Sequence, residues 1–165
     1  RRERWRELVA HRDDVLVAGF DVFDSFLAIE ERVAGLRKIR IRPWAGAREF
    51  HIDSDEPAYR MALDANEEVG SEIVRYTYTS LTTPRTTYDY DTRTGERVLL
   101  KREPVLGDFD PSQYETEYLW VPARDGECVP VAIVYRRSLF RRDGSAPLLQ
   151  YGYGAYGISS DPLFS

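Results

Sequence analysis

Hydrophobic and polar residues alternate with a period of two over most of the stretch from Val15 to Val105, and residues typical of turns interrupt the alternation. In EIVRYTYTS, for example, Val74, Tyr76 and Tyr78 occupy one set of alternate positions and polar residues occupy the other. Successive side chains of a strand point to opposite faces, so this pattern predicts short antiparallel strands, with a Thr-Gly turn inside TTYDYDTRTGERVLL. The stretch therefore favours a β-meander.

Two segments depart from the strand pattern and have some helical character, Trp5 to Asp14 and, more weakly, a turn near Pro57 to Ala65. A faint internal repeat is also present. LRKIRIRPWAGAREFHIDSDEP and PRTTYDYDTRTGERVLLKREPV both run strand, glycine-containing turn, strand, and then an acidic residue followed by proline. Repeated four-stranded units of this kind are typical of β-propeller blades, which cannot bury their own faces alone. The repeat predicts two blades, complete or incomplete.

The composition and the hydrophobic pattern of the sequence change after residue 106. Residues 107–113 are rich in glycine, proline and aspartate and are expected to form a linker. Beyond them we expect two strands around an Asp125-Gly126 turn, and the apolar run of residues 131–134 is typical of a strand covered on both faces, as in α/β sheets. A third short strand is expected from Pro147 to Tyr151. The predicted organisation is therefore propeller blades over residues 1–106, a linker over 107–113 and the start of a second domain over 114–165.

The composition is that of an ordinary soluble protein, with 42% hydrophobic and 31% charged residues in a chain of 165. A formal net charge of −5 provides no long-range attraction for nucleic acid, and no apolar run has the length of a membrane span or the form of a signal peptide. We therefore expect a soluble, cytoplasmic protein without a nucleic-acid or membrane partner. Cys128 stands alone, which excludes an internal disulfide, and His11 and His51 lie too far upstream to suggest that it is a nucleophile.

The segment PLLQYGYGAYGISSDPLFS contains a literal G-x-G-x-x-G at Gly152, Gly154 and Gly157. In a dinucleotide-binding fold these glycines open a helix, and an acidic residue that holds the ribose follows about 20 positions later. Pro162 disfavours a helix after the loop, and the strands before it are predicted to be hairpins rather than part of a βαβ unit. The pattern therefore argues against a nucleotide loop.

The glycines can instead serve the aromatic residue between them. Gly152 and Gly154 flank Tyr153, and backbone angles that other residues resist would let the chain turn sharply there and project the phenol into a cleft. A tyrosine hydroxyl, with a reference pKa of about 10, stays protonated at neutral pH and can donate to the negative oxygen of a tetrahedral acyl-transfer intermediate. The equal alternative is a turn whose aromatic rings merely pack.

Other polar clusters favour structural roles. Asp89 and Asp91 lie on one strand of a predicted hairpin that lacks the remaining ligands of a calcium loop. Glu30 and Glu31 are adjacent, so on a strand they point to opposite faces and make a poor acid/base pair. His51 is expected to be an ordinary strand residue. A basic set of alternate residues is expected to face water: Lys38, Arg40 and Arg42.

Taken together, several segments resemble the prolyl oligopeptidase family of serine peptidases, and within it the oligopeptidase B (protease II) branch. They are, in collinear order, WRELVAHRDDVLVAGFDVFDSFLAIEERVAGLR, SLTTPRTTYDYDTRTGERVLLKREPV, YLWVPARDG, VPVAIVYRR and PLLQYGYGAYG. The Ala155-Tyr156 pair in GYGAYG favours that branch. The resemblance implies a mostly β chain in which the last blades of a seven-bladed propeller are followed by the first strands of an α/β-hydrolase domain. It also implies that Tyr153 is the oxyanion tyrosine and that Tyr156 lies near the substrate pocket.

The sequence contains no G-x-S-x-G elbow, so no serine has the turn that activates a nucleophile, and Ser145 is expected in a loop. The family places its serine, aspartate and histidine after the Tyr153 loop, whereas His11 and His51 precede it. We therefore expect an inactive segment of a serine oligopeptidase, whose complete form hydrolyses short peptides after Arg or Lys through an acyl-enzyme, without metal or cofactor. The alternatives are a non-catalytic propeller or sandwich binding module and a post-proline-cleaving relative. The oligomeric state is not predicted.

Overall fold

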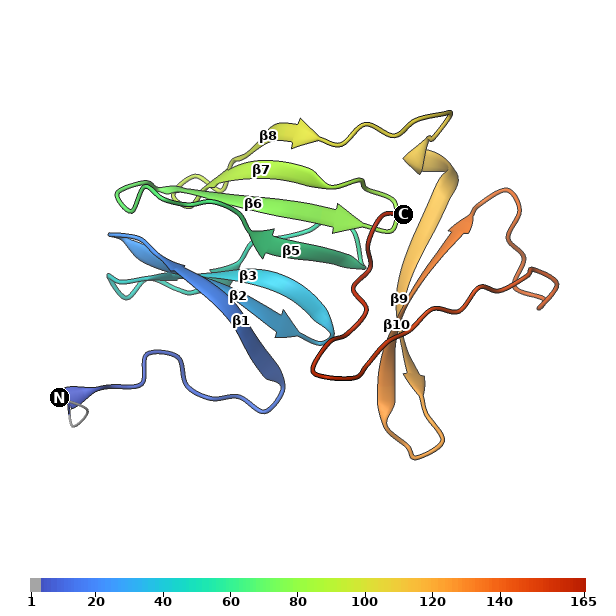
Figure 1. Cartoon of the computed structure of the whole chain (residues 1–165), viewed down its shortest axis with the longest axis horizontal. Helices are drawn as coiled ribbons and strands as arrows, with labels where there is room; N and C mark the ends of the chain where they lie inside the picture. The colour runs from blue at the N-terminus through green and yellow to red at the C-terminus, as the bar shows by residue number, and fades with distance from the viewer. Residues whose placement is uncertain (1–3) are drawn as a thin grey trace.

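The chain folds into two parts, a large sheet and a separate two-stranded hairpin beside one end of it (Figure 1). This computed structural model describes residues 4–165, and residues 1–3 of the first predicted domain lie outside that range. Strands and short 3-10 turns are the regular elements of residues 4–165, with no α-helix among them. The described residues accordingly include no helix long and apolar enough to cross a membrane. The predicted mostly β character is confirmed.

The first half of the sheet is a four-stranded antiparallel unit. It contains β1 (Val15–Val22), β2 (Phe26–Val33), β3 (Leu36–Pro43) and the short β4 (Phe50–His51). A two-residue turn at Ala34 and Gly35 joins β2 to β3, and both residues have positive φ angles, 51° and 82°. Positive angles at both central positions match the right-handed twist of the flanking strands, which makes this a favourable hairpin connection.

The second half of the sheet is another four-stranded antiparallel unit. It contains β5 (Tyr59–Leu63), β6 (Ile73–Ser80), β7 (Thr86–Asp91) and β8 (Arg97–Arg102), and the predicted Thr-Gly turn lies between the last two. The two units are joined by one parallel pair, Arg37 of β3 opposite Arg60 of β5. The antiparallel meander expected from the sequence is therefore wrong at this junction, although the chain does build two successive four-stranded units.

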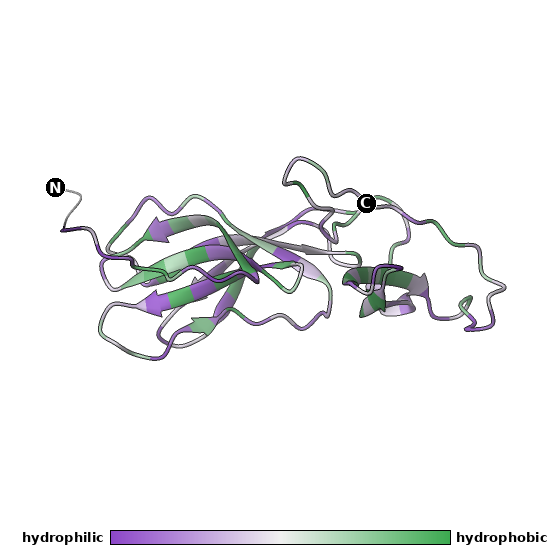
Figure 2. Cartoon of the chain, turned by 90° about the horizontal axis from the view of Figure 1, so that it is seen from below, coloured by the Kyte–Doolittle hydropathy of each residue, from purple (hydrophilic) through white to green (hydrophobic). Residues whose placement is uncertain are grey.

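The core lies on the alternate apolar positions that the sequence pattern indicates, and Figure 2 shows the resulting bands of hydrophobic and hydrophilic residues along the strands. Ile39 and Ile41 of β3 are completely buried, as is Tyr76 of β6. The expectation that the basic residues of this strand face water is wrong for Arg40. This residue is only 8% exposed, and its guanidinium pairs with the buried Glu31. A buried charge needs a partner of opposite sign, and β2 supplies it.

Neither segment with helical character forms a helix. Residues 5–14 follow an irregular course, and Trp5 remains exposed. A short helix is marginal in water unless it buries an apolar face against the rest of the protein. The stretch from Pro57 to Ala65 contains β5 instead, because Tyr59 and Met61 enter the core and the backbone pairs with β6.

The second part of the chain is a hairpin of β9 (Tyr114–Pro122) and β10 (Cys128–Arg136), preceded by the 3-10 turn η2 (Pro111–Gln113). The hairpin turns at Gly126, whose φ is 91°, as predicted. The apolar run of β10 is not covered on both faces by residues 4–165, since Val134 stays 41% exposed. The expected doubly covered strand is therefore not found within this part of the chain.

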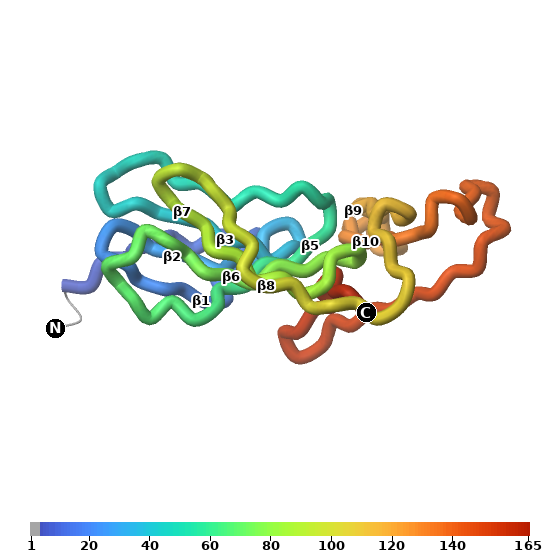
Figure 3. The backbone as a smooth tube through the Cα atoms, turned by 90° about the horizontal axis from the view of Figure 1, so that it is seen from above, coloured from blue at the N-terminus to red at the C-terminus, as the bar shows by residue number. Residues whose placement is uncertain are grey.

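The third strand expected from Pro147 to Tyr151 does not form. These residues run as an extended segment in which Leu149 is 93% exposed. A strand needs a neighbour that pairs with its backbone N–H and C=O groups, and the described residues place none beside this segment. Figure 3 shows the chain looping away from both sheets here before it turns back.

Candidate functional site

Tyr153, the residue predicted to donate to an oxyanion, lies in a loop that two backbone hydrogen bonds close. The Ser160 N–H donates to the Tyr153 carbonyl over 3.3 Å, and the Ile158 N–H donates to the Ala155 carbonyl over 3.0 Å. The Tyr153 side chain is 48% exposed, and its hydroxyl is not hydrogen-bonded to any part of residues 4–165. Such a hydroxyl is available as a donor to a ligand.

The glycines that flank Tyr153 do not have the backbone that the sequence suggests. Positive φ angles occur at Tyr156 (54°) and Gly157 (70°), and Gly152 and Gly154 have no such angle. The expectation of a sharp glycine turn at the phenol is therefore wrong, because the turn is made three residues further along. A tyrosine in the left-handed region is uncommon, and the glycine after it completes the turn at no steric cost.

The other side chains that could take part in acyl transfer are not brought to this loop. Tyr156, expected near a substrate pocket, is 94% exposed. The hydroxyl of Ser145 donates to Asp143 in its own turn. The histidine rings have carboxylate partners far from the loop in sequence: His11 with Asp13 at 3.0 Å and His51 with Glu31 at 2.7 Å. Residues 4–165 thus contribute a candidate donor, Tyr153, without a serine–histidine pair.

The chain that follows the loop returns to the large sheet and is anchored there. Pro162 is buried, and the Phe164 N–H donates to the Thr79 hydroxyl over 3.3 Å. The Phe164 ring lies edge-on to Phe109, with 5.0 Å between the ring centroids. Asp161, between the loop and these contacts, has its carboxylate against arginines of the sheet. Figure 1 shows this segment passing between the sheet and the β9–β10 hairpin.

The β9–β10 hairpin contacts the same end of the sheet. The Tyr118 hydroxyl of β9 donates to the Ala34 carbonyl over 2.8 Å. A Cβ atom added to Gly35 would lie 2.3 Å from that hydroxyl oxygen and 2.9 Å from the ring of Pro130. Only glycine therefore allows the hairpin to approach the β2–β3 turn this closely.

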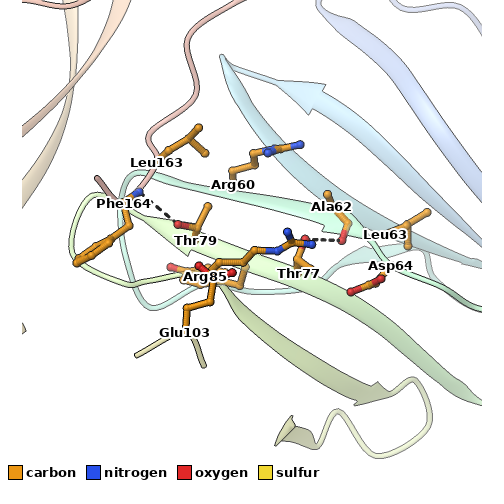
Figure 4. A pocket seen from close by; sticks show the side chains of 11 residues that line it. Arg60, Ala62, Leu63, Asp64, Thr77, Thr79, Arg85, Glu103, Leu163 and Phe164 are labelled. Carbon is orange, nitrogen blue, oxygen red and sulfur yellow. Dashed lines mark hydrogen bonds between the residues drawn. The ribbon is translucent and has the colours of Figure 1, made fainter. Parts of the chain in front are cut away.

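A cleft of about 440 Å³ opens beside the anchored segment (Figure 4). Its lining includes charges of both signs, Arg60 and Arg85 together with Asp64 and Glu103. Figure 4 shows Phe164 at the edge of this cleft, next to the threonine that it contacts. The loop tyrosines do not line the cleft, so this hollow and the candidate oxyanion donor are separate features.

Glu31 is a completely buried carboxylate with three partners. It lies 2.7 Å from Arg12 Nη2, 3.2 Å from Arg40 Nε and 2.7 Å from His51 Nε2. Burial by itself would raise the pKa of this carboxyl, but the bond from His51 and the charges of Arg40 and Arg12 hold the pKa below its ordinary value of 4.5. Glu30 faces the other side of β2, as the alternation predicts, and has a different arginine partner.

Glu56 is a second enclosed carboxylate, and its partners are hydroxyl groups. Four side chains donate to it: Tyr78 over 2.6 Å, Ser80 over 2.6 Å, Thr82 over 2.6 Å and Thr83 over 2.8 Å. Burial favours a raised pKa, but the hydroxyl donors outweigh it and keep the pKa of Glu56 below 4.5. A carboxylate with all its acceptor positions in use stabilises the fold and has no free lone pair for acid–base work.

Sequence reasoning missed these enclosed carboxylates. The signal for Glu31 is its place in the alternation of β2, on the same face as Leu27 and Ile29 of the apolar run FLAI. Asp89 and Asp91 are hairpin residues, as the sequence predicts. Asp89 accepts two bonds from Arg75, at 2.8 and 2.9 Å, and Asp91 accepts backbone N–H groups of its own turn. No cluster of three or more His, Cys, Asp or Glu side chains suited to a metal occurs in residues 4–165.

Comparison with known proteins gives a consistent set of relatives. A sequence profile described as the prolyl oligopeptidase N-terminal β-propeller domain matches residues 1–103. Dipeptidyl aminopeptidase BI of Pseudoxanthomonas mexicana is 51% identical over 165 residues, which cover 99% of this chain and 22% of that protein. Protease 2 of Moraxella lacunata is 36% identical over 159 residues, covering 96% of this chain and 21% of that protein. The chain thus spans about a fifth of the length of these curated relatives.

Solved structures agree with the sequence matches. Oligopeptidase B from Trypanosoma brucei superposes with a TM-score of 0.83 at 30% identity, covering 96% of this chain and 23% of that one. Oligopeptidase B from Leishmania major superposes with a TM-score of 0.79 at 32% identity, covering 96% of this chain and 23% of that one.

Proposed function

The chain belongs to the prolyl oligopeptidase family of serine peptidases, and from this premise we propose that the full-length protein hydrolyses short peptides after Arg or Lys by acyl-enzyme chemistry. Tyr153 is the oxyanion donor in this proposal. The other catalytic groups, a serine and its histidine base, belong to parts of the full-length protein outside these residues. This chain by itself is expected to be inactive, since its sequence has no G-x-S-x-G elbow.

The single observation that carries the role of Tyr153 is its place in a closed loop with an unengaged hydroxyl. The loop is closed at its base by the bond from the Ser160 N–H to the Tyr153 carbonyl, while the phenol is half exposed. A hydroxyl held in position without an internal acceptor can donate fully to charge that develops on a substrate oxygen. Donors of this kind act because they are already oriented before the charge forms.

The preference for Arg or Lys is supported by the likeness to the two oligopeptidase B structures. A second candidate activity is favoured by the higher identity to a protein named dipeptidyl aminopeptidase, which suggests release of dipeptides from a free N-terminus. A post-proline preference is a third possibility within the same family. A cytoplasmic location and independence from cofactors stay predictions.

The deciding experiment uses the full-length protein and a matched peptide panel. Each peptide carries Arg, Lys or Pro before the scissile bond, and each is made with a free and with an acylated N-terminus. Cleavage of acylated Arg and Lys peptides supports the proposal, whereas cleavage of free-amine peptides alone supports the dipeptidyl activity. Cleavage after Pro alone supports the post-proline preference. Saturable binding without turnover of any peptide would favour a non-catalytic binding module.

A further inference from the structure

Three arginines form a row across adjacent strands of the large sheet. Arg32 of β2 is directly opposite Arg37 of β3, and Arg37 is directly opposite Arg60 of β5. The Arg37–Arg60 pair is also the one ladder pair that joins the two four-stranded units in the described residues. Like charges directly opposite each other on neighbouring strands are destabilising. The junction between the two units therefore requires acidic partners.

Asp161 meets this requirement from a segment that is remote in sequence. Its Oδ1 atom lies 2.8 Å from Arg32 Nη2, and its Oδ2 atom lies 3.4 Å from Arg37 Nε and 3.5 Å from Arg60 Nε. The Asp161 side chain is only 10% exposed. Oδ1 and the two Nε atoms lack well-aligned hydrogen bonds, so the attraction is that of charges in close contact rather than of directed donors.

Glu30 is the other carboxylate at this row, 2.6 Å from Arg37 Nη1. The cluster thus holds three guanidinium groups and two carboxylates, and loss of Asp161 would leave one carboxylate for three cations. Removing one partner from a largely buried ion cluster is costly because charge is left uncompensated away from water. The sheet therefore holds Asp161 strongly in place.

Asp161 directly follows Ser160, whose N–H closes the Tyr153 loop. On the other side of the loop, Tyr151 and Leu149 are exposed and reach no strand of residues 4–165. The contacts that fix the loop to the rest of the described chain therefore begin at Asp161. Asp161 is the first of these attachments, ahead of the buried Pro162 and of Phe164, and the closed loop of residues 153–160 connects it directly to Tyr153.

We propose that Asp161 is a positioning residue: by pairing with the arginine row at the junction of the two four-stranded units, it holds the Tyr153 loop at a fixed place relative to the propeller strands. This inference rests on the proposed oxyanion role of Tyr153. It adds that the donor's alignment is set by the propeller sheet, through a residue that does not touch the substrate.

The test compares Asp161→Asn with Asp108→Asn in the full-length protein. Asp108 is an exposed acid between β8 and η2 and undergoes the same chemical change without a place in the arginine cluster. Arg60→Gln is a second, milder variant that removes one cation of the row and retains the carboxylate. Two experiments are made on each variant: amide hydrogen exchange of peptides covering residues 153–160, and steady-state kinetics that give kcat and KM for the best peptide substrate.

Asp161→Asn is expected to speed exchange in residues 153–160 and to lower kcat about tenfold with KM changed less than about twofold, since a small misplacement of a catalytic group costs rate rather than binding. Arg60→Gln should act in the same direction more weakly, and Asp108→Asn should change neither quantity. In a Tyr153→Phe background, Asp161→Asn should lower kcat by less than about twofold, because the group that it aligns is already absent.

Unchanged exchange in both Asp161→Asn and Arg60→Gln would overturn the inference, and so would faster exchange with unchanged kcat. A tenfold loss of kcat that persists in the Tyr153→Phe background would also overturn it, because Asp161 would then act through another group. Failure of the proposed function itself is recognised separately, since Tyr153→Phe alone would then leave kcat unchanged.

Discussion

The hydroxyl of Tyr78 on β6 donates to Oε2 of Glu56 over 2.6 Å, which links the core strand to the loop that precedes β5. Three further hydroxyls complete the coordination of this carboxylate, those of Ser80, Thr82 and Thr83. The turn after β6 is thus organised around one negative charge. Burial of the Tyr78 ring is the main cause that raises the pKa of its hydroxyl, and the bond to the Glu56 carboxylate raises this pKa further.

Replacement of Glu56 by Gln is expected to lower the free energy of unfolding of the full-length protein by about 2–3 kcal/mol, because hydrogen bonds to a charged group are worth more than neutral ones and the amide would present N–H groups to hydroxyl donors. Denaturant unfolding followed by fluorescence measures the change. Asp55→Asn is the control, since Asp55 is an exposed neighbour whose ion pair with Arg97 contributes little. Equal effects of the two substitutions would contradict the assignment.

Stability should also fall in acid because of Glu56 and Glu31. Both carboxyls have a pKa in the folded protein below the ordinary value of 4.5. For a depressed pKa, the stabilisation is complete above the unfolded value and is lost as the pH falls through the folded value. The free energy of unfolding should therefore be flat with respect to these groups above about pH 5 and decline below about pH 4.5. Denaturant titrations at successive pH values check this, and Glu56→Gln should make the decline shallower.

Gly35→Ala is expected to destabilise the contact between the β2–β3 turn and the β9–β10 hairpin. The new methyl group would meet the Tyr118 hydroxyl at 2.3 Å and Pro130 at 2.9 Å, at a position whose φ is 82°. Gly46→Ala is the matched control, because Gly46 lies outside the β9–β10 hairpin, has a similar φ of 74° and has no atom within 4 Å of an added Cβ. Both variants carry a left-handed strain of about 1–2 kcal/mol, and only Gly35→Ala adds the steric clash.

The difference between the two variants in the free energy of unfolding therefore isolates the clash. Hydrogen exchange of residues 114–122 provides the local readout, and it should rise in Gly35→Ala alone. Equal destabilisation of the two variants, with unchanged exchange in β9, would show that the hairpin does not depend on this close approach.

Tyr153→Phe in the full-length protein is expected to lower kcat by about 10²–10³-fold with a smaller change in KM, since the loss of an oxyanion donor acts on the transition state. Steady-state kinetics on the substrate identified by the peptide panel measure this. Tyr151→Phe is the control, because it removes an exposed hydroxyl two residues away. A fall of less than a few-fold in Tyr153→Phe would show that another group holds the oxyanion.

Tyr156→Ala tests the prediction that Tyr156, in the same loop, lies near the substrate pocket. If this exposed ring contributes to substrate binding, KM should rise several-fold while kcat changes little, the pattern of a contact made equally in the ground and transition states. A fall in kcat without a change in KM would indicate instead that the left-handed turn at Tyr156 positions the loop.

The local sequence determined the strands and most of their turns. The alternation around Ile39 and Tyr76 sufficed to place their side chains in the core, and the glycines at positions 95 and 126 marked hairpin turns. These features depend on the two-residue period of a strand and on backbone angles that neighbouring residues set. They can be read without knowing what lies across the molecule.

The tertiary structure alone decided how distant charges meet. The sequence pattern predicts that Arg40 faces water, whereas the structure pairs it with the buried Glu31. No local pattern indicates that Asp161 contacts the arginine row of three strands. The β5 segment likewise became a strand because β6 was there to pair with it. The free energy of a buried ion pair or a strand pairing depends on the partner's position, and the arginines around Asp161 precede it by more than 100 residues along the chain. Their contacts therefore follow from the packing of the sheets and not from any local pattern.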